Sequence, residues 1–138
     1  MSILTNVPLM IVPFIVYNLA ALGLIGGDST DLWQNEVMAL GMISGATWSM
    51  SLGDLMIALG LLLLFFEILK ATRTGANSIL DHLLSTFVFV AYLVEFLLVR
   101  SAAHSVFFIL MVITFVDVIA GFSVTIRSAV RDVSVERY

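Results

Sequence analysis

Residues 105–126, SVFFILMVITFVDVIAGFSVTI, decide the fold because a single charged residue, Asp117, interrupts an otherwise apolar run. A helix needs about 20 such residues to cross the roughly 30 Å of hydrocarbon in a bilayer. Helices are favoured there because unpaired backbone groups are too costly in lipid. A membrane β-strand would be shorter and would alternate apolar with polar residues. The stretch is therefore predicted to be a membrane-spanning helix.

Three further apolar runs precede it, at residues 7–27, 50–69 and 79–99. The four runs together predict an all-α membrane protein, a single domain built as an antiparallel bundle of four transmembrane helices. The connector at residues 70–78 is short, so the second and third helices are expected to be antiparallel neighbours. In the first run, Pro8 fits near a helix start, whereas Pro13 lies deeper and should kink or loosen the helix.

The overall composition supports a membrane protein. Of 138 residues, 61% are hydrophobic and 12% are charged, whereas soluble domains average about 45–50% apolar and about 25% charged residues. So few charges cannot cover a surface that faces water. Six Lys and Arg residues and a net charge of -4 argue against nucleic-acid binding. The absence of cysteine excludes a disulfide framework.

The basic residues predict the orientation. Most of them lie in the connector at residues 70–78 or in the tail at residues 127–138, namely Lys70, Arg73, Arg127 and Arg131, followed by Arg137. The positive-inside rule then puts both termini in the cytoplasm and residues 28–53 outside. Trp33 and Trp48 suit an aromatic belt at the outer interface.

The outer connection, residues 28–53, is long enough to form a cap on the bundle. Ser44, Gly45 and Ala46 predict a turn between two apolar stretches. A short β-hairpin over the outer mouth of the bundle is favoured. A re-entrant or interfacial helix and an irregular cap are the alternatives.

Polar residues inside the spans are the default candidates for a functional site. Asp117 is the foremost, because it lies near the middle of the fourth span and its side chain is too short to reach either surface. The candidate intramembrane cluster consists of Asp117, Asn18, Tyr92, Glu95 and Asp81. One interpretation is a proton or cation path with Asp117 at its centre and Glu95 and Asp81 as flanking stations. The other is a structural cluster in which a neutral Asp117 hydrogen bonds to Asn18 or Tyr92 and fixes the helix register.

The remaining titratable residues predict no catalytic or cofactor site. Glu67 and Lys70 are three apart on one helix, which favours a local ion pair. His82 and His104 lie at opposite ends of the third helix, roughly 30 Å apart, so they cannot ligate one haem together. No metal-ligand, nucleophile-elbow or phosphate-loop motif occurs. The chain is therefore predicted to be neither an enzyme nor a cofactor-binding protein.

Several stretches carry a resemblance to a known group. SGATWSMSLGDL, FFEILKATRTG, ILDHLLSTFVF, VEFLLVRSAA and VDVIAGFSVTIRSA are similar to sequences in a group of small bacterial inner-membrane proteins with no established activity. The resemblance implies a multi-pass protein of the bacterial inner membrane. The topology also resembles voltage-sensor and claudin-like proteins, but the repeated arginines of the former and the cysteine pair of the latter are missing.

These observations predict a non-catalytic accessory, scaffold or assembly subunit. It would act through helix packing in a larger or self-associated membrane complex, with lipid and other membrane subunits as partners. The alternative is a small proton- or cation-conducting bundle centred on Asp117.

Overall fold

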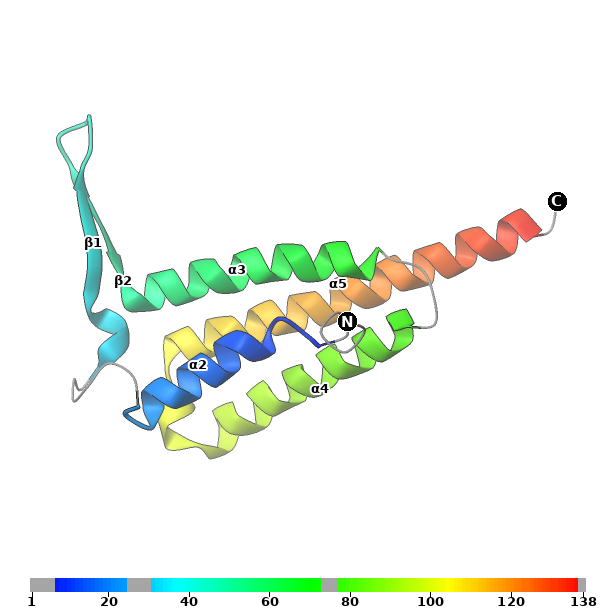
Figure 1. Cartoon of the computed structure of the whole chain (residues 1–138), viewed down its shortest axis with the longest axis horizontal. Helices are drawn as coiled ribbons and strands as arrows, with labels where there is room; N and C mark the ends of the chain where they lie inside the picture. Colours follow the sequence, from blue (N-terminus) through cyan, green and yellow to red (C-terminus); the bar gives the residue numbers. More distant parts are fainter. Residues whose placement is uncertain (1–6, 25–30, 73–76, 137–138) are drawn as a thin grey trace.

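The computed structural model describes residues 7–24, 31–72 and 77–136, with the backbone alone at residues 77–78, 125, 128–129 and 131–136 (Figure 1). Within them the chain forms four α-helices, two short 3-10 helices and one β-hairpin. In chain order these are α2 (Ile11–Ala21), η1 (Leu32–Gln34), β1 (Glu36–Gly41), β2 (Thr47–Ser51), α3 (Leu52–Ala71), α4 (Asn77–Leu98), η2 (Arg100–Ala102) and α5 (Ser105–Glu136). The prediction of a mainly helical chain with four helices is confirmed.

Three of the helices are long and apolar enough to cross a membrane. The apolar segments are Leu52–Ala71, Ile79–Leu98 and Ser105–Val124, close to three of the predicted spans. A capping box starts α3: the Ser51 hydroxyl accepts from the Asp54 N–H, and the Asp54 carboxylate accepts from the Ser51 N–H. The helix α5 continues to Glu136, so the predicted tail at residues 127–138 is helical over most of its length.

The first predicted span differs from the others because α2 has only 11 residues. Its length of about 17 Å does not cross a hydrocarbon core of roughly 30 Å. The chain enters α2 through a turn in which the Ile11 N–H donates to the Pro8 carbonyl. The helix ends in a Schellman motif at Gly23, whose φ of +79° is costly for other residues. Local backbone signals therefore shorten a helix that hydropathy alone extends to residues 7–27.

The centre of the bundle is α5, which packs along both α3 and α4. Figure 1 shows α5 running between these two helices, and α3 and α4 contact each other much less. They are antiparallel and in contact, as predicted, but each of them packs mainly on α5. A buried seam of α5 at helical spacing, including Val106, Leu110 and Ile113, faces Gly53 and Gly60 of α3.

Five aromatic rings form a layer in the half of the bundle nearer the hairpin. Phe107 of α5 lies 4.9 Å from Tyr17, 5.2 Å from Tyr92 and 6.5 Å from Phe96, measured between ring centroids. Phe14 packs edge-on against Tyr92 at 4.9 Å. We call these five side chains the aromatic layer, and its consequence is a dry, closely packed interior at that level.

Residues 36–51 form the predicted β-hairpin. The strands β1 and β2 pair antiparallel, with Leu40 opposite Trp48 and Ala39 opposite Ser49. Gly45, with a φ of +89°, lies in the connecting turn. The hairpin confirms one of the alternatives for this connection, but its position was predicted wrongly. It projects away from the helices beside the start of α3 rather than covering the end of the bundle (Figure 1).

Candidate functional site

Six polar side chains from three helices gather at the end of the bundle away from the hairpin. We call this group the polar cluster; its members are Glu67 and Lys70 of α3, Asp81, His82 and Ser85 of α4, and Asp117 of α5. They line a cavity of about 10 Å³ together with Ala71 and Gly121. A cavity of roughly that size is at the lower limit for one water molecule, so the cluster has no room for an organic substrate.

Asp117 of α5 is one of two buried carboxyl groups in the polar cluster, the other being Glu67. The Asp117 side chain is 5% exposed and shares a hydrogen bond with the Ser85 side chain. The interpretation in which Asn18 or Tyr92 bonds Asp117 therefore has the wrong partner. Ser85 lies four residues after Asp81 on one face of α4, and this face meets α5 at the level of Asp117.

Glu67 and Lys70 tie the start of the chain to α3. The Glu67 Oε1 accepts from the Lys70 Nζ at 3.3 Å and from the Leu9 backbone N–H at 2.6 Å. The Lys70 Nζ also donates to the Val7 carbonyl at 3.0 Å. The predicted ion pair is confirmed, and it also satisfies backbone groups that the shortened α2 leaves outside its own hydrogen bonds.

His82 lies against α5 because residue 121 is glycine. A Cβ atom at position 121 would come within 2.7 Å of the His82 ring, closer than atoms can pack. The ring also lies 5.5 Å from that of Phe122, and the Thr86 hydroxyl donates to the His82 carbonyl. Gly121 thus sets the close approach of α4 and α5 at the polar cluster.

The other predicted cluster residues lie elsewhere. The Asn18 Nδ2 donates to the Glu95 Oε2 at 3.1 Å and to the Phe14 carbonyl at 2.9 Å. Tyr92 is fully buried in the aromatic layer, and its hydroxyl donates to the Met10 carbonyl at 3.0 Å. Glu95 is ten residues from Ser85 on α4, about 15 Å along the helix. The five predicted residues therefore form two polar groups, with Tyr92 between them.

The topology-setting basic residues take part unequally. Lys70 belongs to the polar cluster, whereas Arg127 is exposed on α5. Arg73 lies outside the described residues, and Arg131 is described by its backbone alone.

The chemistry of the polar cluster is that of proton and water binding. The cluster contains three carboxyl groups, one ammonium group, an imidazole and a hydroxyl, and the ammonium group of Lys70 pairs with the Glu67 carboxylate. Within residues 7–24, 31–72 and 77–136 no group of three His, Asp or Glu side chains is arranged to hold a metal ion. The arrangement can hold a proton and one small polar molecule.

Sequence reasoning missed the backbone partners of these side chains. Pro8 delays the start of α2 and leaves backbone groups free of the helix. As a result, the Leu9 N–H donates to Glu67, and the carbonyls of Val7 and Met10 accept from Lys70 and Tyr92. The two prolines were the signal that could have revealed them. A second missed contact joins the His104 Nε2 to the Asp31 carboxylate at 3.2 Å near the hairpin.

Comparison with known proteins gave no relative. No family model, curated protein or solved structure matches the chain.

Proposed function

We propose that this chain is a non-catalytic subunit of a larger assembly in a bacterial inner membrane, and that its hairpin docks on a partner protein. The observation that supports this is the hairpin's one-sided apolar face. Residues opposite each other in an antiparallel pair lie on the same face, and successive residues alternate. The register therefore collects Met38, Leu40, Trp48 and Met50 on one face.

The paired positions on the opposite face of the hairpin are small or polar, and Val37 lies at the irregularity between Glu36 and Met38. The opposite face carries Ala39, Gly41, Thr47 and Ser49. Met38, Leu40 and Trp48 are 45%, 51% and 39% exposed, so the bundle does not cover the apolar face. A two-stranded hairpin is marginally stable alone and needs a packed face. Large apolar side chains gathered on one exposed face are typical of protein contact sites.

The proposed orientation of the protein in the membrane follows from the positions of its basic residues. With both termini in the cytoplasm, the hairpin lies on the outer side, beyond the start of α3. There it is at or above the headgroup region, where hydrocarbon no longer solvates apolar side chains. We propose a protein surface as the partner that buries Leu40 and Trp48; the lipid interface, which also suits Trp48, is the alternative that the following experiment distinguishes.

Site-specific photo-crosslinking in native membranes tests this function. A photoreactive residue at position 40 should give one discrete adduct with a protein, whereas the same residue at position 49, on the polar face, should not. A further control at Leu62, an exposed residue of α3, should crosslink to lipid. Equal protein adducts from positions 40 and 49, or lipid adducts alone from position 40, would contradict the proposal.

Proton or cation conduction centred on Asp117 is the second candidate, favoured by the burial of that carboxyl group in the polar cluster. Along α4, Tyr92 of the aromatic layer lies between the polar cluster and Glu95, and its ring weighs against a continuous path. Purified protein in liposomes under a membrane potential distinguishes the two functions. A subunit without a path passes no protons above empty liposomes, whereas a conductor passes them and loses the flux in Asp117→Asn.

A further inference from the structure

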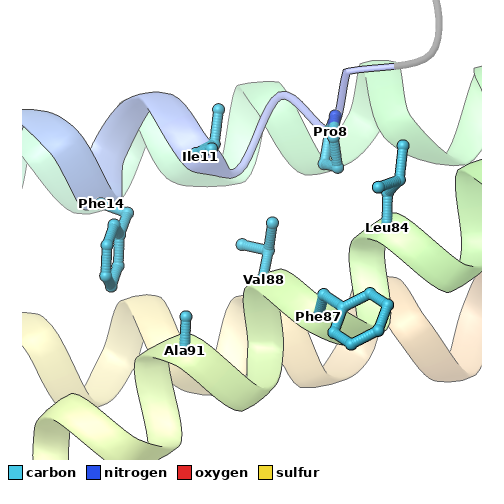
Figure 2. A pocket seen from close by; sticks show the side chains of 7 residues that line it. All are labelled: Pro8, Ile11, Phe14, Leu84, Phe87, Val88 and Ala91. Carbon is cyan, nitrogen blue, oxygen red and sulfur yellow. The ribbon is translucent and has the colours of Figure 1, made fainter.

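An apolar groove opens between α2 and α4. Its volume is about 300 Å³, and it is lined by Pro8, Ile11, Phe14, Leu84, Phe87, Val88 and Ala91. Figure 2 shows Phe14 on α2 pointing toward α4, and Leu84 and Val88 on α4 pointing toward α2. Phe87 at the edge is 62% exposed, so the groove opens to the surroundings of the bundle.

The groove exists because of how the chain enters α2. Pro8 keeps residues 7–10 out of the helix, and the Glu67 carboxylate and Lys70 ammonium hold Leu9 and Val7 against α3. On the α4 side Val88 lies near the middle of the groove and Ala91 lies at the end nearer Phe14 (Figure 2). The Val88 and Ala91 side chains are too small to fill the space.

The lining decides the chemistry of the occupant. All seven lining side chains are hydrocarbon, so a water molecule would find almost no hydrogen-bond partner there. An empty groove would forfeit the dispersion contacts of its walls. An apolar molecule is therefore the occupant that the lining favours.

The dimensions of the groove distinguish between two apolar occupants, a helix and a single hydrocarbon chain. Leu84 and Ala91 are seven residues apart, about 10 Å along α4, so the 300 Å³ correspond to a cross-section of roughly 30 Å². A helix with its side chains is about 10 Å wide, which is roughly 80 Å² in cross-section. The groove therefore cannot enclose a whole helix of a partner protein.

We propose that the groove binds one acyl chain of a phospholipid in the leaflet on the polar-cluster side. This inference rests on the membrane insertion that belongs to the proposed function, but not on the hairpin's partner. Leu84 lies in the half of α4 that carries the polar cluster, and Ala91 lies just past the middle of the helix, so the groove extends over the depth reached by the chains of that leaflet.

Photo-crosslinking from the lipid tests the site. The protein is reconstituted in nanodiscs of phosphatidylcholine containing a small fraction of phosphatidylcholine with a diazirine in the middle of one acyl chain. Irradiation followed by peptide mass spectrometry should place adducts on Phe14, Leu84 and Phe87 at least five-fold more often than on the exposed α3 residues Leu61 and Leu62. Adducts spread evenly over the exposed residues would overturn the proposal.

A groove-filling variant supplies the matched comparison. Ala91→Phe should reduce the groove adducts at least five-fold, whereas Leu97→Phe, at a 69% exposed position of the same helix, should leave them unchanged. Ala91→Leu is the smaller substitution if circular dichroism shows that Ala91→Phe does not fold. Unchanged groove adducts in a folded filled variant would overturn the proposal.

Failure of membrane insertion would give a different result. The protein would then leave the membrane fraction in a carbonate wash and would carry no lipid adducts on any helix. Loss of the hairpin's partner, in contrast, leaves the lipid adducts in place.

Discussion

The bundle and the hairpin expose apolar side chains in opposite circumstances. On α3, α4 and α5 the large exposed residues are largely apolar, and two acidic residues, Glu67 and Asp117, are buried in partnered positions. Hydrocarbon solvates such a surface, and polar groups must find partners inside it. The hairpin also exposes Leu40 and Trp48, but it projects beyond the helices (Figure 1).

The comparison shows that the exposed apolar surfaces of the bundle and of the hairpin need different explanations. In the membrane location that we propose, lipid alone covers the bundle's surface, and the fold depends on buried contacts among α3, α4 and α5. The hairpin's face requires something else to cover it. Substitutions in the bundle should therefore change stability, whereas substitutions on the hairpin should change assembly.

The largest expected effect on the bundle comes from Glu67→Ala. It removes the acceptor of both the Leu9 N–H and the Lys70 Nζ, and a partly buried ammonium group left without its carboxylate costs about 3 kcal/mol. We expect the free energy of unfolding to fall by that amount in an SDS titration of detergent-solubilised protein. An unchanged value would mean that the polar cluster does not hold the bundle together.

Gly121→Leu should have the next largest effect. Its Cβ would meet the His82 ring at 2.7 Å, and overpacking at such a contact costs about 2 kcal/mol. Gly41→Leu is the matched control, because a Cβ at position 41 meets nothing within 4 Å. Equal losses of unfolding free energy in the two variants would contradict the expectation that substitutions in the bundle destabilise the fold more than substitutions in the hairpin.

Asn18→Ala should have a smaller effect. It removes the hydrogen bond to Glu95 at 3.1 Å, and such interhelical bonds average about 0.6 kcal/mol. The same titration measures this loss, with Leu22→Ala, at a 74% exposed residue, as control. A loss as large as that of Glu67→Ala would make the Asn18–Glu95 pair a second structural centre.

Leu40→Ser should have the smallest effect on stability. The side chain touches no core residue and is half exposed, so the free energy of unfolding of the bundle should change by less than about 0.5 kcal/mol. The helical circular dichroism signal on heating gives an independent check. A clear loss of helix stability would show that the hairpin supports the bundle.

The positions of the helices and of the hairpin were largely predictable from the sequence, but the packing arrangement of the helices was not. Hydropathy placed three helices within about two residues at their starts, and Ser44, Gly45 and Ala46 placed the turn of the hairpin. Hydropathy could not show which faces of the helices are buried, because runs that are apolar on all sides have no polar face to orient them.

The packing signals in the sequence were small or charged residues. Gly60 and Glu67, seven apart on α3, are buried, and Gly60 lies where a Cβ would touch Leu110 at 3.0 Å. The candidate site was also predicted in part, because charged residues within apolar runs mark it. Asp117 and Asp81 lie in the polar cluster, whereas Asn18 and Glu95 pair with each other, and Glu95 is about 15 Å along α4 from Ser85. Backbone partners such as the Val7 carbonyl depend on where α2 starts, which hydropathy does not specify.

The mass of the gently solubilised complex tests the central claim most directly. Native mass spectrometry compares the wild type with the double variant Leu40→Ser/Trp48→Ser, and with Thr47→Ala/Ser49→Ala on the opposite face. We predict that the first pair of substitutions releases a monomer with unchanged helix stability, and that the second pair leaves a larger complex intact. A complex of the same mass in all three proteins, or a monomer in the wild type, would contradict the account.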